Sequence, residues 1–582
     1  SRGWGALSAA LESGKIDQSE VSTSTPWLPR RGGIRPLDLA LRAAMGLESN
    51  AVPQGRAQLL AWALDRELER LSDDSLAPDQ WRVALGSLAL TLHREGRHTA
   101  TREEVEALIR PLFLAQEEAY NAGQDEAGAG QRSSDQAVVP LEPAEQEPDE
   151  KEVARQLKQQ ERQRAAQERE ASKRAQKALA SLLRDTTVLR ARDHDHVTFA
   201  SPALRTYLAA CQLAQDTEDS RRNAIAVLTE HVRDPRWQEV LTLYAGLSPV
   251  EALILARLQG QDDLFRSDLL AVAEYVSVAG PAGCPDRRVR DGILGELAKI
   301  MMRSHQPLAL RRAAARALVR TGNKGVPLLF HRALGESDVP LRAVAVWGLG
   351  EWADKRDDKT VAALIRAVND PGRLVRAAAL HALASIGGEA ATDGLVEGLQ
   401  HEDEFTRRVA AEALSRLGTV GYDLLKEAVQ FTDMHIRRAA VYGLGLINEE
   451  WVGPLLDDLR RNDREWFVRS AVEEVLATRE RAAQSDFSPH PLHQIDWLTR
   501  WAAERGLQVS SEAAAKHVLL QALEEGDWPV RLAAADTLCA QGGLWAVDAL
   551  QRALRDEDDL VREAAFAALK EISWRSGERI SG

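Results

Sequence analysis

Apolar residues recur at three- and four-residue spacing along most of the chain, which is the period of an α-helix that buries one face. Before residue 121 this pattern predicts helices in PLDLALRAAMGL, GRAQLLAWALDRELERL, DQWRVALGSLALTLHREG and TREEVEALIRPLFLAQEEAY. Thr101 and Glu104 add a capping-box pattern at the start of the last segment. The hydrophobic pattern therefore predicts an all-α protein.

One stretch has the period of a β-strand instead. TVLRAR and HVTFAS alternate apolar and polar residues around a polar RDHDH, so the sequence predicts one short β-hairpin in front of a helix. His194 and His196 have a spacing that occurs in metal sites, but no other His or Cys cluster lies near them. A solvated hairpin tip explains both side chains, and we expect no metal site here.

Residues 121–150 change in character, because they are acidic and rich in Gly, Pro, Ser and Gln. This composition predicts a disordered linker. The segment that follows, KEVARQLKQQERQRAAQEREASKRAQKALASLL, favours a helix but has almost no apolar stripe before Ala175. It predicts a solvated helix stabilised by charge pairs along its surface, and an arm that contacts a partner or RNA is the alternative.

From about residue 308 a short template recurs, in which an Arg stands seven residues before a Leu. Most copies are about 31 residues apart, and the one gap of 62 residues has Arg500 and Leu507 at its midpoint. Such a period predicts an α-solenoid of two-helix repeats, with TRWAAERGL as a degenerate copy. The repeat arginines are Arg311, Arg342, Arg376, Arg407, Arg437, Arg469, Arg531 and Arg562.

The template also indicates which face of each helix packs. At 100° per residue, positions +2, +3, +6 and +7 after the Arg share one face, and small and apolar residues occupy them. An Asp four to six residues before the Arg can cap the helix and pair with an Arg of the same or an adjacent repeat. We therefore interpret the arginines as an internal Asp–Arg ladder, whose expected aspartates are Asp370, Asp403, Asp433, Asp463, Asp527 and Asp558.

Positions +1 and +5 point away from the packed face and vary between copies. Solenoids bind partners on their concave surfaces, which the second helices line, so varied aromatic and Arg residues there predict a recognition surface. Plain solvent exposure is the alternative. We expect a protein or peptide ligand there, or self-association, and the candidate residues are Arg312, Arg316, Trp347, His381, Arg408, Arg438, Tyr442 and Trp501.

The repeats resemble HEAT repeats of the short bacterial type that also occurs in phycobilin-lyase-like proteins. A second resemblance lies in the F-x-x-P-x-L-x-x-Y-L-A-A motif, formed by Phe199, Pro202, Leu204, Tyr207 and Leu208, which is similar to the winged-helix end of NACHT-type STAND ATPases. Together they imply a domain order of 1–75 (NACHT-associated helical region), 76–118 and 176–215 (winged helix), 119–175 (inserted linker and charged helix), 216–284 (linker helices) and 285–582 (HEAT solenoid).

Motifs of nucleotide binding and catalysis are absent from the sequence. The nearest match to G-x-x-x-x-G-K-[ST], ESGKID, has Ile16 where the hydroxyl residue is needed. G-x-S-x-G, H-E-x-x-H and a plausible Cys–His pair are absent too. We therefore expect no enzymatic activity and no cofactor in this chain. The chain starts at Ser1 without Met, so either a NACHT domain that binds ATP or ADP precedes it, or the protein has none.

Charge and cysteine content bear on the class of partner and on the cellular compartment. The formal net charge of −14 at pH 7 makes a general nucleic-acid binder an unfavoured reading. The sequence has no run of eighteen apolar residues, so it predicts no membrane span. The widely separated cysteines form no metal or disulfide pattern, which is typical of a reducing, cytoplasmic setting, and they are Cys211, Cys284 and Cys539.

Several functional hypotheses follow. The NACHT resemblance implies the regulatory and sensor half of a signal-transduction ATPase, in bacterial defence or signalling, whose repeats bind a ligand and control activation and oligomerisation. The second hypothesis is a stand-alone scaffold or adaptor that binds a protein partner on its concave face. A third hypothesis, an enzyme of the bilin-lyase type, is supported only by the resemblance of the repeats. Nucleic-acid binding would fall to Arg312, Arg316, Arg408 and Arg438.

Overall fold

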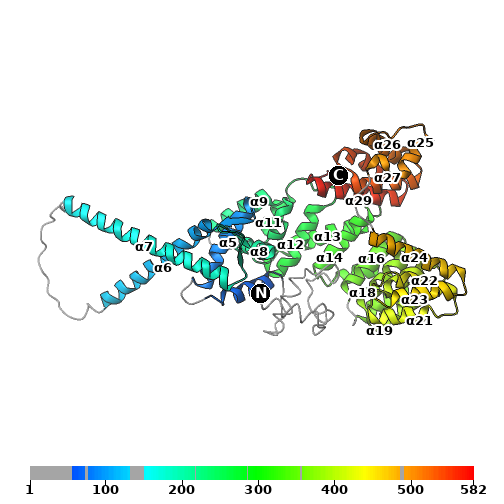
Figure 1. Ribbon diagram of the computed structural model, residues 1–582, viewed down its shortest axis with the longest axis horizontal. Helices are drawn as coiled ribbons and strands as arrows, with labels where there is room; N and C mark the ends of the chain where they lie inside the picture. The colour runs from blue at the N-terminus through cyan, green and yellow to red at the C-terminus, as the bar shows by residue number, and fades with distance from the viewer. Residues whose placement is uncertain are drawn as a thin grey trace. The chain divides into compact units, whose positions relative to one another are not determined.

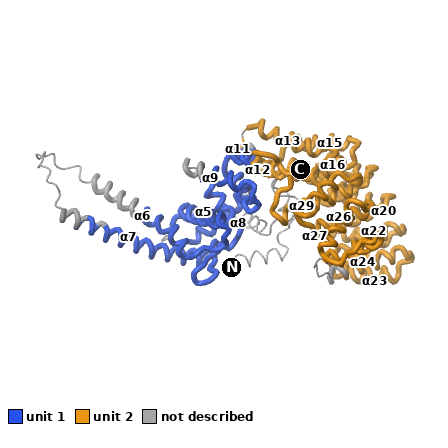
Figure 2. The backbone as a smooth tube through the Cα atoms, turned by 90° about the horizontal axis from the view of Figure 1, so that it is seen from above, with its two compact units in different colours: residues 1–27, 34–256, 278–283 blue, residues 28–33, 257–277, 284–582 orange. Residues whose placement is uncertain are grey.

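The computed structural model describes residues 56–71, 76–130, 150–215, 218–284, 286–353, 357–484 and 491–581. These residues fall into two compact units, which Figure 2 shows in different colours. The first unit lies within 34–256 and 278–283, and the second lies within 257–277 and 284–582. The helix predicted at PLDLALRAAMGL lies outside the described residues.

The first unit is helical apart from one small sheet (Figure 1). Its elements are α4 (Arg56–Leu68), α5 (Pro78–Arg94), β1 (Thr99–Thr101), α6 (Arg102–Gly130), α7 (Glu150–Asp185), β2 (Leu189–Ala191), β3 (His196–Phe199), α8 (Pro202–Leu213), α9 (Glu218–His231), η1 (Pro235–Trp237), α10 (Gln238–Ala245) and α11 (Glu251–Leu258). α12 (Ser267–Gly283) follows and is kinked at Gly280, whose φ is 62°.

The sheet is antiparallel, with the strand order β1–β3–β2. Its β2–β3 hairpin confirms the prediction, but β1 was not expected, because three residues are too few to show alternation. The strand is revealed by its pairing with β3, in which Thr99, Ala100 and Thr101 lie opposite Thr198, Val197 and His196. The N–H of Thr101 donates to the Glu104 carboxylate at 2.7 Å and the N–H of Glu104 donates to Thr101 Oγ1 at 3.1 Å, so the predicted capping box starts α6 directly after β1.

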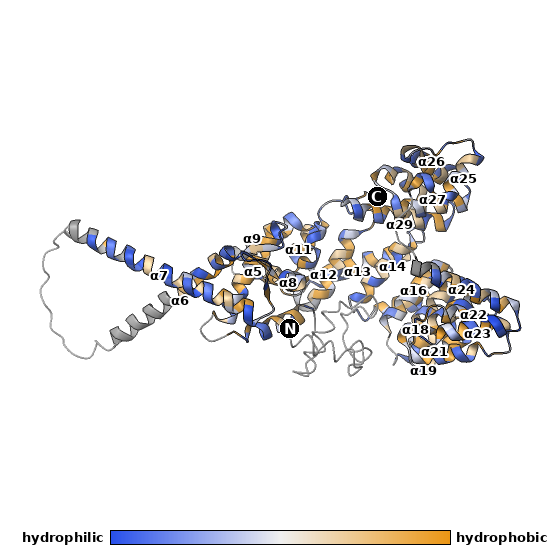
Figure 3. Cartoon of the chain, in the orientation of Figure 1, coloured by the Kyte–Doolittle hydropathy of each residue, from blue (hydrophilic) through white to orange (hydrophobic). Residues whose placement is uncertain are grey.

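α6 and α7 follow one another in the first unit and pack together. α6 continues to Gly130, so the prediction of a disordered linker is wrong for residues 121–130. Ala, Gln and Glu in this stretch extend a helix that α6 has already nucleated. Residues 131–149 lie outside the described part of the chain. α7 confirms the predicted charged helix, and Figure 3 shows it hydrophilic over most of its length.

α8 carries the F-x-x-P-x-L-x-x-Y-L-A-A motif into the core of the first unit. The Ser201 hydroxyl accepts from the N–H of Leu204 at 3.5 Å, and Pro202 occupies the first turn, which are both helix-start features. α8 packs mainly on α5 and also contacts α4 and α10. Burial in this core accounts for the apolar residues of the motif, namely Phe199, Leu204, Tyr207 and Leu208.

The second unit consists of antiparallel helices that repeat along the chain (Figure 1). This confirms the predicted all-α solenoid. Its elements are α13 (Arg287–Met302), α14 (Leu308–Arg320), α15 (Val326–Ala333), α16 (Val339–Trp352), α17 (Asp358–Ala367), α18 (Arg373–Ile386), α19 (Glu389–Leu399), α20 (Glu404–Leu414), α21 (Thr419–Ala428), α22 (Met434–Leu444), α23 (Val452–Asn462), α24 (Trp466–Gln484), η2 (Leu492–Gln494), α25 (Asp496–Glu504), α26 (Glu512–Glu525), α27 (Trp528–Gln541), η3 (Leu544–Ala546), α28 (Val547–Ala553) and α29 (Asp559–Ser576).

The even-numbered helices from α14 to α24 form the inner row of the array. Consecutive even-numbered helices pack closely on one another, whereas consecutive odd-numbered helices from α15 to α23 contact one another far less. The more closely packed row follows the shorter arc of a curved stack and therefore lies on its concave side. Gly443 allows one of these close approaches, because a Cβ there would lie 2.5 Å from the carbonyl oxygen of Ala411.

The stacking changes after α24. The degenerate copy predicted around Arg500 contributes α25, but a single 3₁₀ turn, η2, stands where its first helix would be. α24 and α25 make no extensive contact among the described residues, and α29 contacts α14 instead. There the Glu563 carboxylate accepts from the N–H groups of Leu308 and Ala309. The solenoid is therefore two arrays, α13–α24 and α25–α29, that meet through α29 and α14.

The residues after α29 return to the loop that precedes α12. Arg579 donates two hydrogen bonds to the carboxylate of Asp268, at 2.8 and 3.2 Å. It also lies 3.6 Å from Asp262 and from Asp263. Asp268 is 2% exposed and pairs with Arg257 as well, at 2.7 Å. The C-terminal residues thus form a mostly buried charge cluster with the beginning of the same unit.

Candidate binding face of the repeat array

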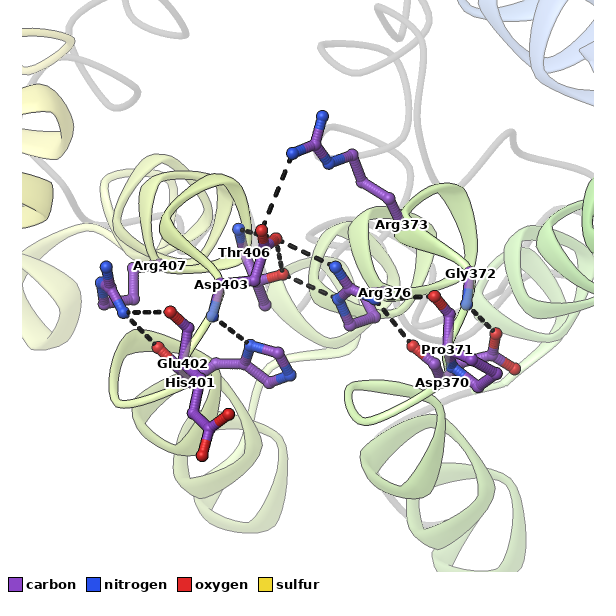
Figure 4. A network of polar contacts seen from close by, with 10 residues as sticks. All are labelled: Asp370, Pro371, Gly372, Arg373, Arg376, His401, Glu402, Asp403, Thr406 and Arg407. Carbon is purple, nitrogen blue, oxygen red and sulfur yellow. Dashed lines mark hydrogen bonds and ion pairs between the residues drawn. The ribbon is translucent and has the colours of Figure 1, made fainter.

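All repeat arginines except Arg311, which donates to the carbonyl of Met301 in α13, contact the loop before their own helix. Most also contact the corresponding loop of the following repeat, as Figure 4 shows for Arg376. In Arg376, Nη1 donates to the carbonyls of Asp370 and Pro371 at 2.9 and 3.1 Å, in its own loop. Nη2 donates to the Asp403 carboxylate at 2.9 Å and Nε donates to Thr406 Oγ1 at 2.8 Å, in the next loop. One guanidinium therefore fixes the distance between two successive repeats.

The same arrangement recurs along the unit. Each of these arginines pairs with an Asp of the following repeat at 2.7 to 2.9 Å, in Arg311–Asp338, Arg342–Asp370, Arg376–Asp403, Arg437–Asp463 and Arg531–Asp556. Burial in a partly dry environment strengthens such charge-assisted hydrogen bonds. The contacts are internal, so these arginines hold the stack together and are not available to a ligand.

Not every expected member takes part in this ladder. Asp433 and Asp558 cap α22 and α29, and the Asp527 side chain makes no cap hydrogen bond. Asp338 and Asp556 take part although they were not singled out from the sequence. Three repeat arginines donate to carbonyls of their own loop but, among the described residues, pair with no Asp of the following repeat. They are Arg407, Arg469 and Arg562.

The ladder changes the protonation of its aspartates. Burial opposes ionisation of Asp403, but hydrogen bonds from Thr406 and Arg376 outweigh burial and hold its pKa at about 2. The same balance of burial against hydrogen bonds from a ladder arginine lowers the pKa of Asp370, Asp463 and Asp556.

We expect the array to lose stability as the pH falls from about 4 toward about 2. An Asp of the unfolded chain has a pKa of about 4. Below that pH the unfolded chain takes up protons that folded Asp403 does not, so the stabilisation by its ionised form decreases. Asp403→Asn should therefore flatten the acid side of a plot of urea midpoint against pH. If the urea midpoint of the variant fell at low pH as steeply as that of wild type, Asp403 would not make this contribution.

A second set of side chains lies on the inner row of helices. They occupy the +1 and +5 positions of the template, together with positions −2 and −3 one turn earlier. We call this set the arginine–aromatic face, and its members are Arg312, Arg316, Trp347, Arg373, His381, Phe405, Arg408, Arg438, Tyr442 and Phe467.

Across α20, α22 and α24 the members of the face contact one another in series. The Arg408 guanidinium lies over the Tyr442 ring at 4.1 Å, and the Arg438 guanidinium lies over the Phe467 ring at 3.8 Å. The Tyr442 hydroxyl donates to Glu474 at 2.8 Å. Each cation therefore stacks on an aromatic ring of the following helix, which orients flat, amphipathic surfaces on the concave side.

The other end of the face is formed by α14 and α16. Arg312 and Arg316 of α14 both lie over the Trp347 ring of α16, at 5.3 and 5.0 Å from its centroid. Between the two ends, Arg373 of α18 lies over the Phe405 ring of α20 at 4.6 Å. Arginine–aromatic contacts thus recur between consecutive second helices of the first array.

The structure corrects two of the predicted partner-binding residues. Tyr442 is 8% exposed because its ring lies beneath Arg408, so it supports the face and offers little surface of its own. Trp501 is 4% exposed and lies on α25, which belongs to the second array. His381 is half-buried on the face, with its Nδ1 3.5 Å from Arg416. The remaining candidates keep their predicted place on the inner row.

Sequence reasoning missed Arg373, Phe405 and Phe467. Phe405 and Phe467 stand two residues before a repeat arginine and therefore three residues before position +1. Side chains three residues apart on a helix are neighbours, so these rings extend the +1 and +5 stripe by one turn. The Phe that opens FTRR and FVRS is the sequence feature that could have predicted these two members of the face.

The arginines of the face differ in their carboxylate partners. Arg408 pairs with Glu412 at 3.0 Å, and Arg438 pairs with Glu404. Among the described residues, no ion pair neutralises Arg312 or Arg316, both of which are exposed. The α14–α16 end of the face is therefore cationic, whereas acidic side chains accompany the arginines of the α20–α24 end.

Metal-ligand and thiol chemistry is sparse in the described part of the chain. It contains no group of three or more His, Cys, Asp or Glu side chains that could hold a metal ion, and His196 Nδ1 lies 2.9 Å from Asp193. The cysteines carry free thiols. Across the described ranges, no helix has both the length and the apolar character that crossing a membrane requires.

The repeats match a known family in sequence. The family model of HEAT repeats covers residues 326–415, 407–477 and 492–573, in both arrays. These segments are HEAT repeats. The first unit lies outside the match, and the comparison gives no support to its NACHT resemblance. A search of curated protein sequences found no match to the chain.

Solved structures with some likeness include human deoxyhypusine hydroxylase in complex with glycerol, at 20% identity over 44% of this chain and 96% of that chain, with a TM-score of 0.20. The complex of CpcE and CpcF of phycocyanin lyase from Nostoc matches at 23% identity over 40% and 88%, with a TM-score of 0.20. The structure in which Kap95p binds RanGDP matches at 13% identity over 64% and 52%, with a TM-score of 0.29. Likeness at TM-scores this low says nothing about the function of this chain.

Proposed function

We propose that the HEAT array is a scaffold that binds a segment of a partner protein against the arginine–aromatic face. The observation that carries the proposal is the series of Arg–aromatic contacts on consecutive second helices of the inner row. Trp, Tyr and Arg are the residues that dominate binding energy at protein interfaces. The curved surface of a repeat array presents them to an extended partner. Such a role needs no cofactor in this chain.

The charge of the face favours a protein partner over a nucleic acid. Glu404, Glu412 and Glu474 lie among its arginines, and each contacts a member of the face. A polyphosphate backbone that followed the inner row would meet these carboxylates. A polypeptide can place apolar groups on the aromatic rings and opposite charges beside both kinds of ionised side chain.

We expect Trp347→Ala and Phe467→Ala each to weaken peptide binding by roughly 30-fold, the effect of removing an interface anchor worth about 2 kcal/mol. The probes are dodecapeptides selected by display on the intact chain, and the measurement is the Kd of the synthetic peptides by fluorescence anisotropy. The matched control is Trp574→Ala, an exposed Trp of α29 outside the face, which is 78% exposed and should leave the Kd unchanged.

Thermal unfolding of each variant separates a loss of binding from a loss of folding. Wild-type affinity in both Trp347→Ala and Phe467→Ala would contradict the proposed function. An equal loss in Trp574→Ala would contradict it too, because the peptides would then recognise exposed aromatic residues in general.

A second candidate is the regulatory and sensor half of a NACHT-type signalling ATPase, for which this scaffold would be the sensor. What supports it is the element order of the first unit, in which α5, β1, α6, α7 and the β2–β3 hairpin succeed one another before α8. Helix, strand, two helices and a hairpin is the order that a winged-helix domain would have. The buried motif residues of β3 and α8 support it as well.

The test of this second candidate is biochemical and does not involve the binding face. The protein expressed with any coding sequence that precedes Ser1 should co-purify with ATP or ADP, which acid extraction and chromatography would detect. It should also change its oligomeric state when the nucleotide is exchanged. A full-length protein without a phosphate-binding loop would contradict the second candidate and leave the scaffold proposal standing.

A further inference from the structure

The α14–α16 end of the face holds an unusual pair of cations. Arg312 and Arg316 are one helical turn apart on α14 and lie over the same Trp347 ring. Like charges at this spacing repel each other on a helix surface. Although Arg312 is exposed at the surface, neighbouring protein atoms keep part of its hydration shell away, and this partial desolvation together with the charge of Arg316 lowers the pKa of Arg312.

Two carboxylates act on Arg312 through their charge alone. Glu351 and Glu563 favour its positive form electrostatically, and among the described residues neither forms an ion pair with it. The Glu563 carboxylate accepts instead from the N–H groups of Leu308 and Ala309, at the start of α14. Two exposed guanidinium groups therefore share one indole, and neither has an ion-pair partner among the described residues.

We propose that Arg312, Arg316 and Trp347 form a clamp for acidic side chains of the partner segment. A carboxylate that binds between the guanidinium groups relieves their repulsion and makes charge-assisted hydrogen bonds to both. The indole provides an apolar floor for the methylene groups of Asp or Glu. The clamp rests on the proposed binding function and assigns the chemistry of one end of the bound segment.

The other arginines of the face sharpen this assignment. Arg408 and Arg438 already have Glu412 and Glu404 as partners, so an incoming carboxylate would compete with bonds that exist. A carboxylate that binds to Arg312 and Arg316 would not have to displace an ion pair between described residues. The acidic part of the partner segment therefore binds at α14 and α16, and its less acidic part binds toward α24.

The experiment uses the dodecapeptides selected by display on the intact chain. We expect Asp or Glu in the selected sequences, and at least a tenfold loss of affinity when these are replaced by Asn or Gln. Arg312→Glu/Arg316→Glu should lose at least tenfold as well. The control Arg332→Glu/Arg461→Glu makes the same charge change on α15 and α23, in the outer row, and should stay within twofold of wild type.

A charge swap gives the most direct test. Peptides whose acidic residues are replaced by Lys should bind the Arg312→Glu/Arg316→Glu variant better than the original peptides do. The clamp is overturned if the selected peptides lack acidic residues, if this variant binds them as wild type does, or if the variant loses affinity no more than the control does. Displacement of the peptide by millimolar inorganic phosphate alone, or tight binding of single-stranded RNA to the pair, would also overturn it.

The clamp and the proposed function can fail separately. If Phe467→Ala weakens binding while reversal of the two arginines does not, the scaffold function stands and the clamp is wrong. If the selected peptides are indifferent to every substitution on the face, the proposed function itself is wrong.

Discussion

Arg376→Ala is expected to lower the free energy of unfolding of the repeat unit by about 3 kcal/mol, the cost of removing one partner of a buried ion pair. The substitution removes the guanidinium that hydrogen-bonds the Asp403 carboxylate and leaves Arg373, at 3.7 Å, as its cation. It also leaves the carbonyls of Asp370 and Pro371 without their donor. Unpaired polar groups in a partly buried loop are costly. The urea midpoint of the second unit, followed by circular dichroism, measures the effect.

Two variants test whether the geometry of the arginine matters. Arg376→Lys keeps the charge but cannot donate to four acceptors with a planar fork, so we expect an intermediate loss of stability. Arg366→Ala, an exposed arginine of α17, should change stability by less than about 0.5 kcal/mol. Should Arg376→Ala unfold at the same urea concentration as Arg366→Ala, the ladder would not stabilise the stack.

Arg579→Ala is expected to have an effect of similar size, about 3 kcal/mol, on the junction between the C-terminal residues and the beginning of the second unit. Arg579 is a cation that faces Asp262, Asp263 and Asp268. Without it the buried Asp268 would keep its pair with Arg257 but lose both hydrogen bonds from Arg579. Like charges that lose their counter-ion in a poorly hydrated site repel each other strongly.

Hydrogen exchange locates this effect on the structure. The amide of Leu264 donates to the carbonyl of Ile580 at 3.0 Å, so its protection should fall when the C-terminal residues detach. The amides of the inner row from α16 to α22 should keep their protection. The control Lys570→Ala removes an exposed cation of α29 and should leave the Leu264 amide protected. Unchanged protection in Arg579→Ala would show that the charge cluster does not hold the junction.

These two substitutions act on different parts of one architecture. The ladder sets the spacing of neighbouring repeats within an array, and the Arg579 cluster joins the end of the unit to its beginning. The Arg579 cluster is distant in sequence from the arginine–aromatic face, and the ladder arginines, although adjacent to it in sequence, make internal contacts between loops. Stability and binding can therefore be varied independently. A variant that loosens the junction should therefore keep the clamp at Arg312 and Arg316 intact.

The fold of the repeat unit follows from the residue pattern alone. A period of about 31 residues and the fixed Arg-to-Leu spacing identify two-helix repeats, because each copy must bury the same face against its neighbours. The same reasoning placed +1 and +5 on the open side of the second helices. The hairpin around residues 192–195 and the Thr101 cap were also predictable, since both depend only on local residues.

Contacts between distant residues could be decided only by the tertiary structure. The strand β1 exists because β3 pairs with it across nearly 100 residues, and three residues carry no periodic signal of their own. The pairing of each ladder arginine with the following repeat, the burial of Tyr442, and the return of Arg579 to Asp268 depend on how helices stack. Periodicity fixes which face of a helix is buried, but the neighbour that covers it is chosen by packing in three dimensions.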